Sequence, residues 1–126
     1  MKGKKTMKYL LLARVDEQEL EALSPKEAQK LNDDSLAYDD TLRKRGHLIA
    51  AQALQFSRDA AIVRVPQQGK AVITDGPFVE TKEQVGGFIL VEARDKNEAI
   101  QLASKIPVAR FGAIEVREIK EMVRSG

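Results

Sequence analysis

The residues best suited to chemistry lie in one short stretch, residues 74–83, which reads TDGPFVETKE. Asp75-Gly76-Pro77 predicts a sharp, stiff corner, because Asp bonds its own backbone, Gly accepts a positive φ and Pro fixes φ. In an extended segment beyond the corner, Glu80 and Lys82 would share one face, where a carboxylate beside an ammonium can clamp a ligand. The alternative is a solvated hairpin whose charges only protect a sheet edge from aggregation.

Two functions fit these side chains. In an enzyme, Asp75 or Glu80 would be the general base, working without a cofactor on a small anionic organic molecule in an isomerase-like or lyase-like reaction. Cationic side chains would hold the anion or a developing oxyanion, and an aromatic ring would exclude water. The candidate ligand-binding residues are Arg64, Phe78, Lys82 and Arg117. In a binding or interaction module, which the stiffness of the corner favours, the same charges would form a network between subunits, around a small ligand or a protein partner.

Composition narrows the class of protein. The 126 residues suit one domain, and 43% hydrophobic residues suffice for one core. A net charge of +2 gives no general case for nucleic-acid binding, even with a lysine-rich N-terminus. The absence of cysteine excludes disulfides and thiolate chemistry and favours a reducing, cytoplasmic location. No apolar run approaches the roughly 20 residues of a membrane span, and neither a cofactor motif nor a set of ligands at metal spacing is present, so we expect no cofactor and no metal.

The sequence before the corner gives clear signals for secondary structure. Residues 1–6 are predicted to be a disordered extension, followed by a single domain over residues 7–126. Residues 7–15 form an apolar run typical of a strand buried on both faces in the middle of a sheet. Ser24-Pro25-Lys26-Glu27 predicts a helix start with a capping box, and Gly46 predicts its end. One face of this helix is predicted to pack on the core: Ala28, Leu31, Ser35, Tyr38 and Leu42.

Charged residues are predicted to cover the other face of the same helix. They are Lys30, Asp33, Asp34, Asp39, Asp40, Arg43 and Lys44. The acidic members could bind a metal, but a solvated face is the favoured interpretation. His47, the single histidine, follows the helix end, where a surface position is favoured over a catalytic base.

The remaining elements complete the predicted fold. Strands are expected over residues 48–56, 60–65, 70–74, 88–93 and 111–119, with a flexible joint at 84–87 and a second helix from Asp95 to Ile106. Without the hairpin of residues 60–74, the order is β-α-β-β-α-β, an α+β, ferredoxin-like arrangement. An apolar sheet with helices on one side favours a homodimer packed sheet to sheet, with room for a small ligand between the sheets.

The chain resembles the DGPF-domain proteins of the YCII-related group. The resemblance rests on Asp75-Gly76-Pro77-Phe78-Val79-Glu80-Thr81-Lys82-Glu83 and Gly86-Gly87-Phe88. It is supported by residues 7–12, 63–65, 99–107 and 112–117. It covers about residues 7–119 and implies a dimeric α+β barrel, which is consistent with the sheet-to-sheet homodimer.

The resemblance also bears on activity. It implies a small bacterial cytoplasmic protein, and some relatives in the wider barrel superfamily are enzymes acting on small organic molecules. Members of the YCII group proper are thought to use a histidine–aspartate pair, with the histidine near the start of the first helix. Here that region reads Ser24-Pro25-Lys26-Glu27, and His47 lies at the helix exit, so the pair is not carried over.

Overall fold

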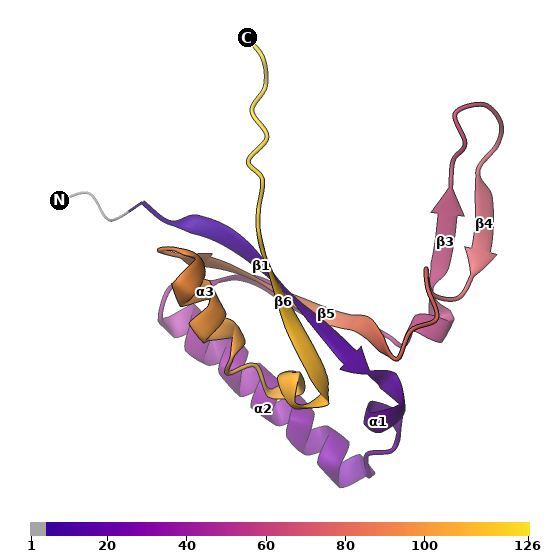
Figure 1. Cartoon of the computed structure of the whole chain (residues 1–126). Helices are drawn as coiled ribbons and strands as arrows, with labels where there is room; N and C mark the ends of the chain where they lie inside the picture. The colour runs from indigo at the N-terminus through magenta and orange to yellow at the C-terminus, as the bar shows by residue number, and fades with distance from the viewer. Residues whose placement is uncertain (1–4) are drawn as a thin grey trace.

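The computed structural model describes residues 5–126, which form a four-stranded sheet with helices on one side and a separate two-stranded hairpin (Figure 1). The strands are β1 (Met7–Asp16), β2 (Leu48–Ala53), β3 (Ala61–Arg64), β4 (Val72–Asp75), β5 (Glu83–Ala93) and β6 (Gly112–Glu118). The helices are α1 (Glu17–Glu21), α2 (Pro25–Lys44) and α3 (Lys96–Ala103), with single 3₁₀ turns at Ser57–Asp59 and Pro107–Phe111. The predicted ferredoxin-like α+β fold with an inserted hairpin is therefore confirmed.

The sheet has the order β2-β5-β1-β6, and every neighbouring pair is antiparallel. The two most apolar strands, β1 and β5, lie in its centre, as the continuous apolar run of β1 predicts. Alternate residues of β1, from Tyr9 and Leu11 to Val15, are buried beneath the helices. Leu10 and Leu12 point to the opposite face, which no helix covers, and they are only partly buried. We expected β1 to be buried on both faces. Within a single chain it is fully buried on one face only.

The helices begin where their caps predict. The Ser24 hydroxyl accepts the Glu27 N–H at 3.1 Å, and the Glu27 carboxylate accepts the Ser24 N–H at 2.9 Å, which completes the capping box of α2. Gly46, at φ +79°, provides the left-handed residue after α2. The Tyr38 hydroxyl on α2 donates to the Leu102 carbonyl of α3 at 2.6 Å and joins the two helices.

The core lies between the helices and the sheet. It contains Tyr9, Leu11, Leu42, Val91, Ala93, Ala99, Ala103 and Ile106, all with less than a tenth of their surface exposed. In the described part of the chain, no helix is both long and apolar enough to cross a bilayer. Of the predicted N-terminal extension, Met1 to Lys4 lie outside the described residues, and the Thr6 hydroxyl donates to the Glu92 carboxylate at 2.9 Å.

The segment after the corner differs from the sequence prediction. Gly76 has φ +99°, as a sharp corner requires, but residues 77–82 are not extended into a strand. The Thr81 N–H donates to the Val79 carbonyl at 3.1 Å, and the Gln84 side chain donates to that same carbonyl at 2.7 Å. These bonds curl the chain, so the expectation that Glu80 and Lys82 share one strand face was wrong.

The predicted flexible joint at residues 84–87 was also wrong, because β5 already begins at Glu83. Glycine is needed here for close packing. A Cβ on Gly86 would lie 2.6 Å from a methyl group of Val15, and a Cβ on Gly87 would lie 2.9 Å from the Gln52 carbonyl oxygen. The paired glycines let β5 approach its neighbours closely, so they mark a tightly packed strand.

Candidate functional site

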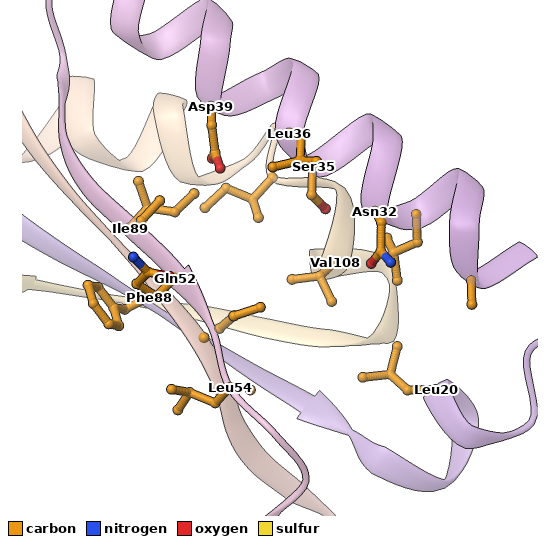
Figure 2. A pocket seen from close by; sticks show the side chains of 18 of the residues that line it. Leu20, Asn32, Ser35, Leu36, Asp39, Gln52, Leu54, Phe88, Ile89 and Val108 are labelled. Atoms are coloured by element: carbon orange, nitrogen blue, oxygen red, sulfur yellow. The ribbon is translucent and has the colours of Figure 1, made fainter.

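A partly open cavity of about 720 Å³ lies between α2 and the sheet (Figure 2). Its wall is largely aliphatic. The main apolar contributors are Leu20, Leu31, Leu36, Ala51, Ile89 and Val108. They come from α1, α2, β2, β5 and the turn before β6, so segments far apart in the sequence together form the cavity.

The cavity exists because α2 contacts the core mainly at its C-terminal end. The structure describes every residue of α2, and Leu42 is the one that is buried. Further toward its N-terminus, the helix faces small residues of the strands, among them Ala13, Ala51 and Gly87, which leave space unfilled. Protein interiors are normally close-packed, and an apolar void forgoes dispersion contacts. The cavity is therefore suited to a guest molecule.

Polar side chains line one side of this cavity. Asn32, Ser35 and Asp39 are spaced by three and four residues along α2, so they share one helix face. Figure 2 shows all three pointing from α2 toward the strands. None of the lining residues in the described part of the chain is a lysine, arginine or histidine. The cavity thus combines an apolar body with a polar ladder whose only charged member is Asp39.

Asp39 stands out electrostatically. It is partly buried, and within residues 5–126 its carboxylate makes no hydrogen bond or ion pair. The nearby Arg43 bonds Asp40 instead, at 2.6 Å. Burial raises the pKa of the Asp39 carboxyl above its ordinary value; Arg43 opposes this change and Asp40 adds to it. The folded protein therefore holds a proton on Asp39 more tightly than the unfolded chain does.

We expect Asp39→Asn to raise the melting temperature at pH 7. A carboxyl whose pKa is raised by folding destabilises the protein as the pH rises through the interval from its unfolded pKa to its folded pKa, and the amide escapes this cost. At about pH 3, below the ordinary carboxyl pKa, the advantage should disappear because Asp39 is protonated in both states. The control is Asp40→Asn, which removes an exposed carboxylate paired with Arg43. A lower melting temperature for Asp39→Asn than for the wild type at pH 7 would contradict this account.

The predicted corner residues fall into two groups, neither of which lines the cavity. In the first, the Arg64 guanidinium lies 5.2 Å from the centre of the Phe78 ring, which remains 70% exposed. Asp75 ends β4, exposed and paired with Ala61 across the hairpin. This group lies at the base and along the first strand of the projecting hairpin.

The second group borders a shallower cleft of about 490 Å³ beside α1. Glu80 and Lys82 line it, and the Lys82 ammonium lies 3.8 Å from an oxygen of Asp16. The Glu17 carboxylate opposite accepts two bonds from Ser57, from its N–H at 2.7 Å and its hydroxyl at 2.5 Å. Arg64 does not border this cleft. The structure of one chain therefore separates Arg64 and Phe78 from Glu80 and Lys82.

Arg117 lies elsewhere, on the uncovered face of β6. Its guanidinium is 3.8 Å from Glu115, whose other oxygen accepts a 2.8 Å bond from Arg14. His47 contacts the Glu92 carbonyl through Nδ1 at 2.8 Å, at the start of β2. Among residues 5–126, no group of three or more histidine, aspartate or glutamate side chains is arranged to hold a metal ion.

The sequence analysis did not identify the cavity, although it predicted that the lining residues Ala28, Leu31 and Ser35 face the core. It assigned Asp39 to the solvated face of the helix, whereas the structure places Asp39 on the cavity wall. A partial signal was present: Ser35 belongs to the predicted core-facing set, and Asn32 and Asp39 each follow a member of that set by one position. Such a polar stripe bordering an apolar one indicates the rim of a site.

Comparison with known proteins supports the resemblance drawn from the corner motif. Residues 7–123 match the family described as the YCII-related domain. A protein of Rhizobium meliloti (strain 1021), uncharacterized protein R00369, is 32% identical over 115 residues, which cover 90% of this chain and 92% of that protein. Because the match covers nearly the whole domain, the chain belongs to the YCII-related family.

Proposed function

We propose that this protein binds a small organic molecule in the cavity between α2 and the sheet. The observation that carries the proposal is the cavity itself, about 720 Å³ of mostly aliphatic wall with Asn32, Ser35 and Asp39 along one side. Ligand sites have volumes of roughly 300–1,000 Å³ and combine apolar walls with a few well-placed polar groups. Ligand binding in this cavity is the function that the geometry supports best.

A library of neutral and charged small organic molecules would test this proposal. Saturation-transfer NMR on the intact chain identifies binders, and each binder should raise the melting temperature as its concentration rises, because it binds only the folded state. Displacement of one binder by another would show that they share one site. If no molecule that fits 720 Å³ gives a saturation-transfer signal, the proposal is refuted.

We also propose that the protein acts as a homodimer joined through the uncovered face of the sheet. Partly exposed apolar residues occupy the middle of that face: Leu10, Leu12, Phe88 and Leu90. Arg14, Glu115 and Arg117 lie at its margin, with charges of both signs available to a symmetric copy. An apolar centre with a charged rim is typical of a protein interface.

The projecting hairpin supports the same proposal. Val63, Val65, Val72 and Ile73 are each more than half exposed, although an isolated two-stranded hairpin is only marginally stable in water. The hairpin and the C-terminal segment after β6 extend to the side of the sheet away from α2 and α3 (Figure 1). A second copy seated on the uncovered face would contact both. Sedimentation equilibrium should accordingly give twice the chain mass of 14.0 kDa.

The functional roles of the corner residues and of Arg117 remain predictions from the sequence. Asp75 and Glu80 are the predicted catalytic carboxylates, and the predicted ligand-binding residues are Arg64, Phe78, Lys82 and Arg117. Because one chain keeps these side chains apart, their action on an anionic ligand would require the second copy to bring complementary groups beside them.

A second candidate function is acid–base catalysis on the molecule held in the cavity. The observation favouring it is Asp39, whose pKa is raised by burial and which faces the cavity. A carboxyl that holds its proton more tightly than usual is suited to exchange that proton with a bound substrate. Binders should then exchange an activated C–H for deuterium in D₂O, and Asp39→Asn should stop the exchange while binding persists. Equal exchange in Asp39→Asn and the wild type would exclude this role.

A further inference from the structure

We propose that the cavity selects an organic ammonium ion, an amine attached to a compact hydrocarbon body, with the Asp39 carboxylate as its counter-ion. This inference rests on the ligand-binding function proposed above and names the class of ligand. It concerns the helix-covered side of the sheet, away from the corner residues.

The charges around the cavity favour a cation. Asp39 is the only ionisable residue in the described wall. The basic residue nearest to it along α2 is engaged elsewhere, because Arg43 bonds Asp40 at 2.6 Å. A ligand in the cavity therefore meets one negative group, without a neighbouring cation on the wall to neutralise it.

Because the Asp39 carboxylate is partly buried, it discriminates between ligands according to their charge. Removing an anion from water is costly, and an opposite charge nearby offsets that cost. An ammonium carries three donors and no acceptor. Besides Asp39, Ser35 lies about one turn away on the same helix face, and its hydroxyl oxygen can accept a further donor. A carboxylate ligand would instead face a like charge, which is a repulsive element against anions.

The apolar wall determines the chemistry of the rest of the ligand. Leu31, Ile89 and Val108 line the cavity from α2, β5 and the turn before β6. Their side chains cannot form hydrogen bonds with a second polar group of the ligand. We therefore infer a ligand with one charged end and a branched or cyclic hydrocarbon body.

Three probes of matched shape test the selectivity: cyclohexylmethylamine, cyclohexylmethanol and cyclohexanecarboxylate. Each is titrated at pH 7 into the full chain labelled with ¹³C at its methyl groups, and the shifts of Leu31, Ile89 and Val108 are followed. Because charge-assisted hydrogen bonds are about twice as strong as neutral ones, we expect the amine to bind about tenfold more tightly than the alcohol. The carboxylate should bind more weakly than the alcohol.

Asp39→Asn should remove the preference for the amine while the alcohol keeps its affinity. Asp33→Asn, which neutralises an exposed carboxylate of α2 that does not line the cavity, should leave the preference unchanged. Equal affinity for amine and carboxylate, or an unchanged preference in Asp39→Asn, would overturn the selectivity but leave ligand binding in place. Absence of shifts at the cavity methyls with all three probes would overturn the binding function as well.

Discussion

Ser35→Phe is expected to abolish binding of small molecules in the cavity, with a loss of at least about tenfold for the alcohol and amine probes. Ser35 points from the middle of α2 toward the strands, so a phenyl ring at this position would occupy the space that a ligand needs. The substitution is compatible with a helix, since serine and phenylalanine have similar propensities. Filling an apolar void with an aromatic ring should also preserve or raise the melting temperature.

Ala37→Phe is the matched control for this experiment. Ala37 lies two residues further along α2, is exposed, and does not line the cavity. It introduces the same ring on the same helix, so affinity should remain at the wild-type level. Equal binding by Ser35→Phe and Ala37→Phe, measured by titration calorimetry, would mean that the ligand binds elsewhere.

Leu12→Asp is expected to convert the dimer to monomers. Leu12 lies at the centre of the uncovered face, opposite Phe88 on β5 and Glu115 on β6. In a two-fold interface each substitution occurs twice, and an unpaired buried carboxylate costs several kcal/mol. The dimer dissociation constant should therefore rise by at least about 100-fold.

Ile100→Asp is the control for the dimer experiment. It places the same charge at an exposed isoleucine of α3, on the opposite side of the sheet. Sedimentation equilibrium at several concentrations should show a dimer for Ile100→Asp and a monomer for Leu12→Asp, both with native circular dichroism. A dimer that persists in Leu12→Asp would move the interface away from this face.

The order of the elements could be predicted because local signals agree with the fold. The capping residues Ser24 and Asp95 and the apolar run of β1 each predict one outcome, and the structure confirms all three. The Asp-Gly-Pro corner was also readable, since Asp-Gly favours a turn and glycine accepts the positive φ that Gly76 adopts.

Errors arose where contacts between distant residues decide the structure. The pair Gly86-Gly87 looked like a joint, but the closeness of Val15 and of the Gln52 carbonyl makes glycine a packing requirement. The curl at residues 79–82 is a local exception, in which the Gln84 side chain donates to the Val79 carbonyl, and no strand pattern reveals that bond.

The candidate site was harder to predict for the same reason. The corner motif concentrates ionisable residues in sequence, yet the structure distributes Arg64 and Lys82 to different surfaces. The cavity, by contrast, forms from six elements, and Asp39, whose pKa is raised by burial, lies in a run of ordinary surface charges. The cavity arises because the N-terminal part of α2 does not pack closely on the sheet. The spacing of residues along one helix does not predict that separation.

The most direct test of the central claim is the position of a bound probe. Intermolecular NOEs between cyclohexylmethanol and the methyl groups of the protein distinguish the two sides of the sheet. The account predicts NOEs to Leu31, Ile89 and Val108, on the helix-covered side. NOEs confined to Leu10, Leu12 and Leu90, on the uncovered face, would contradict it and would place the ligand between the sheets of two copies.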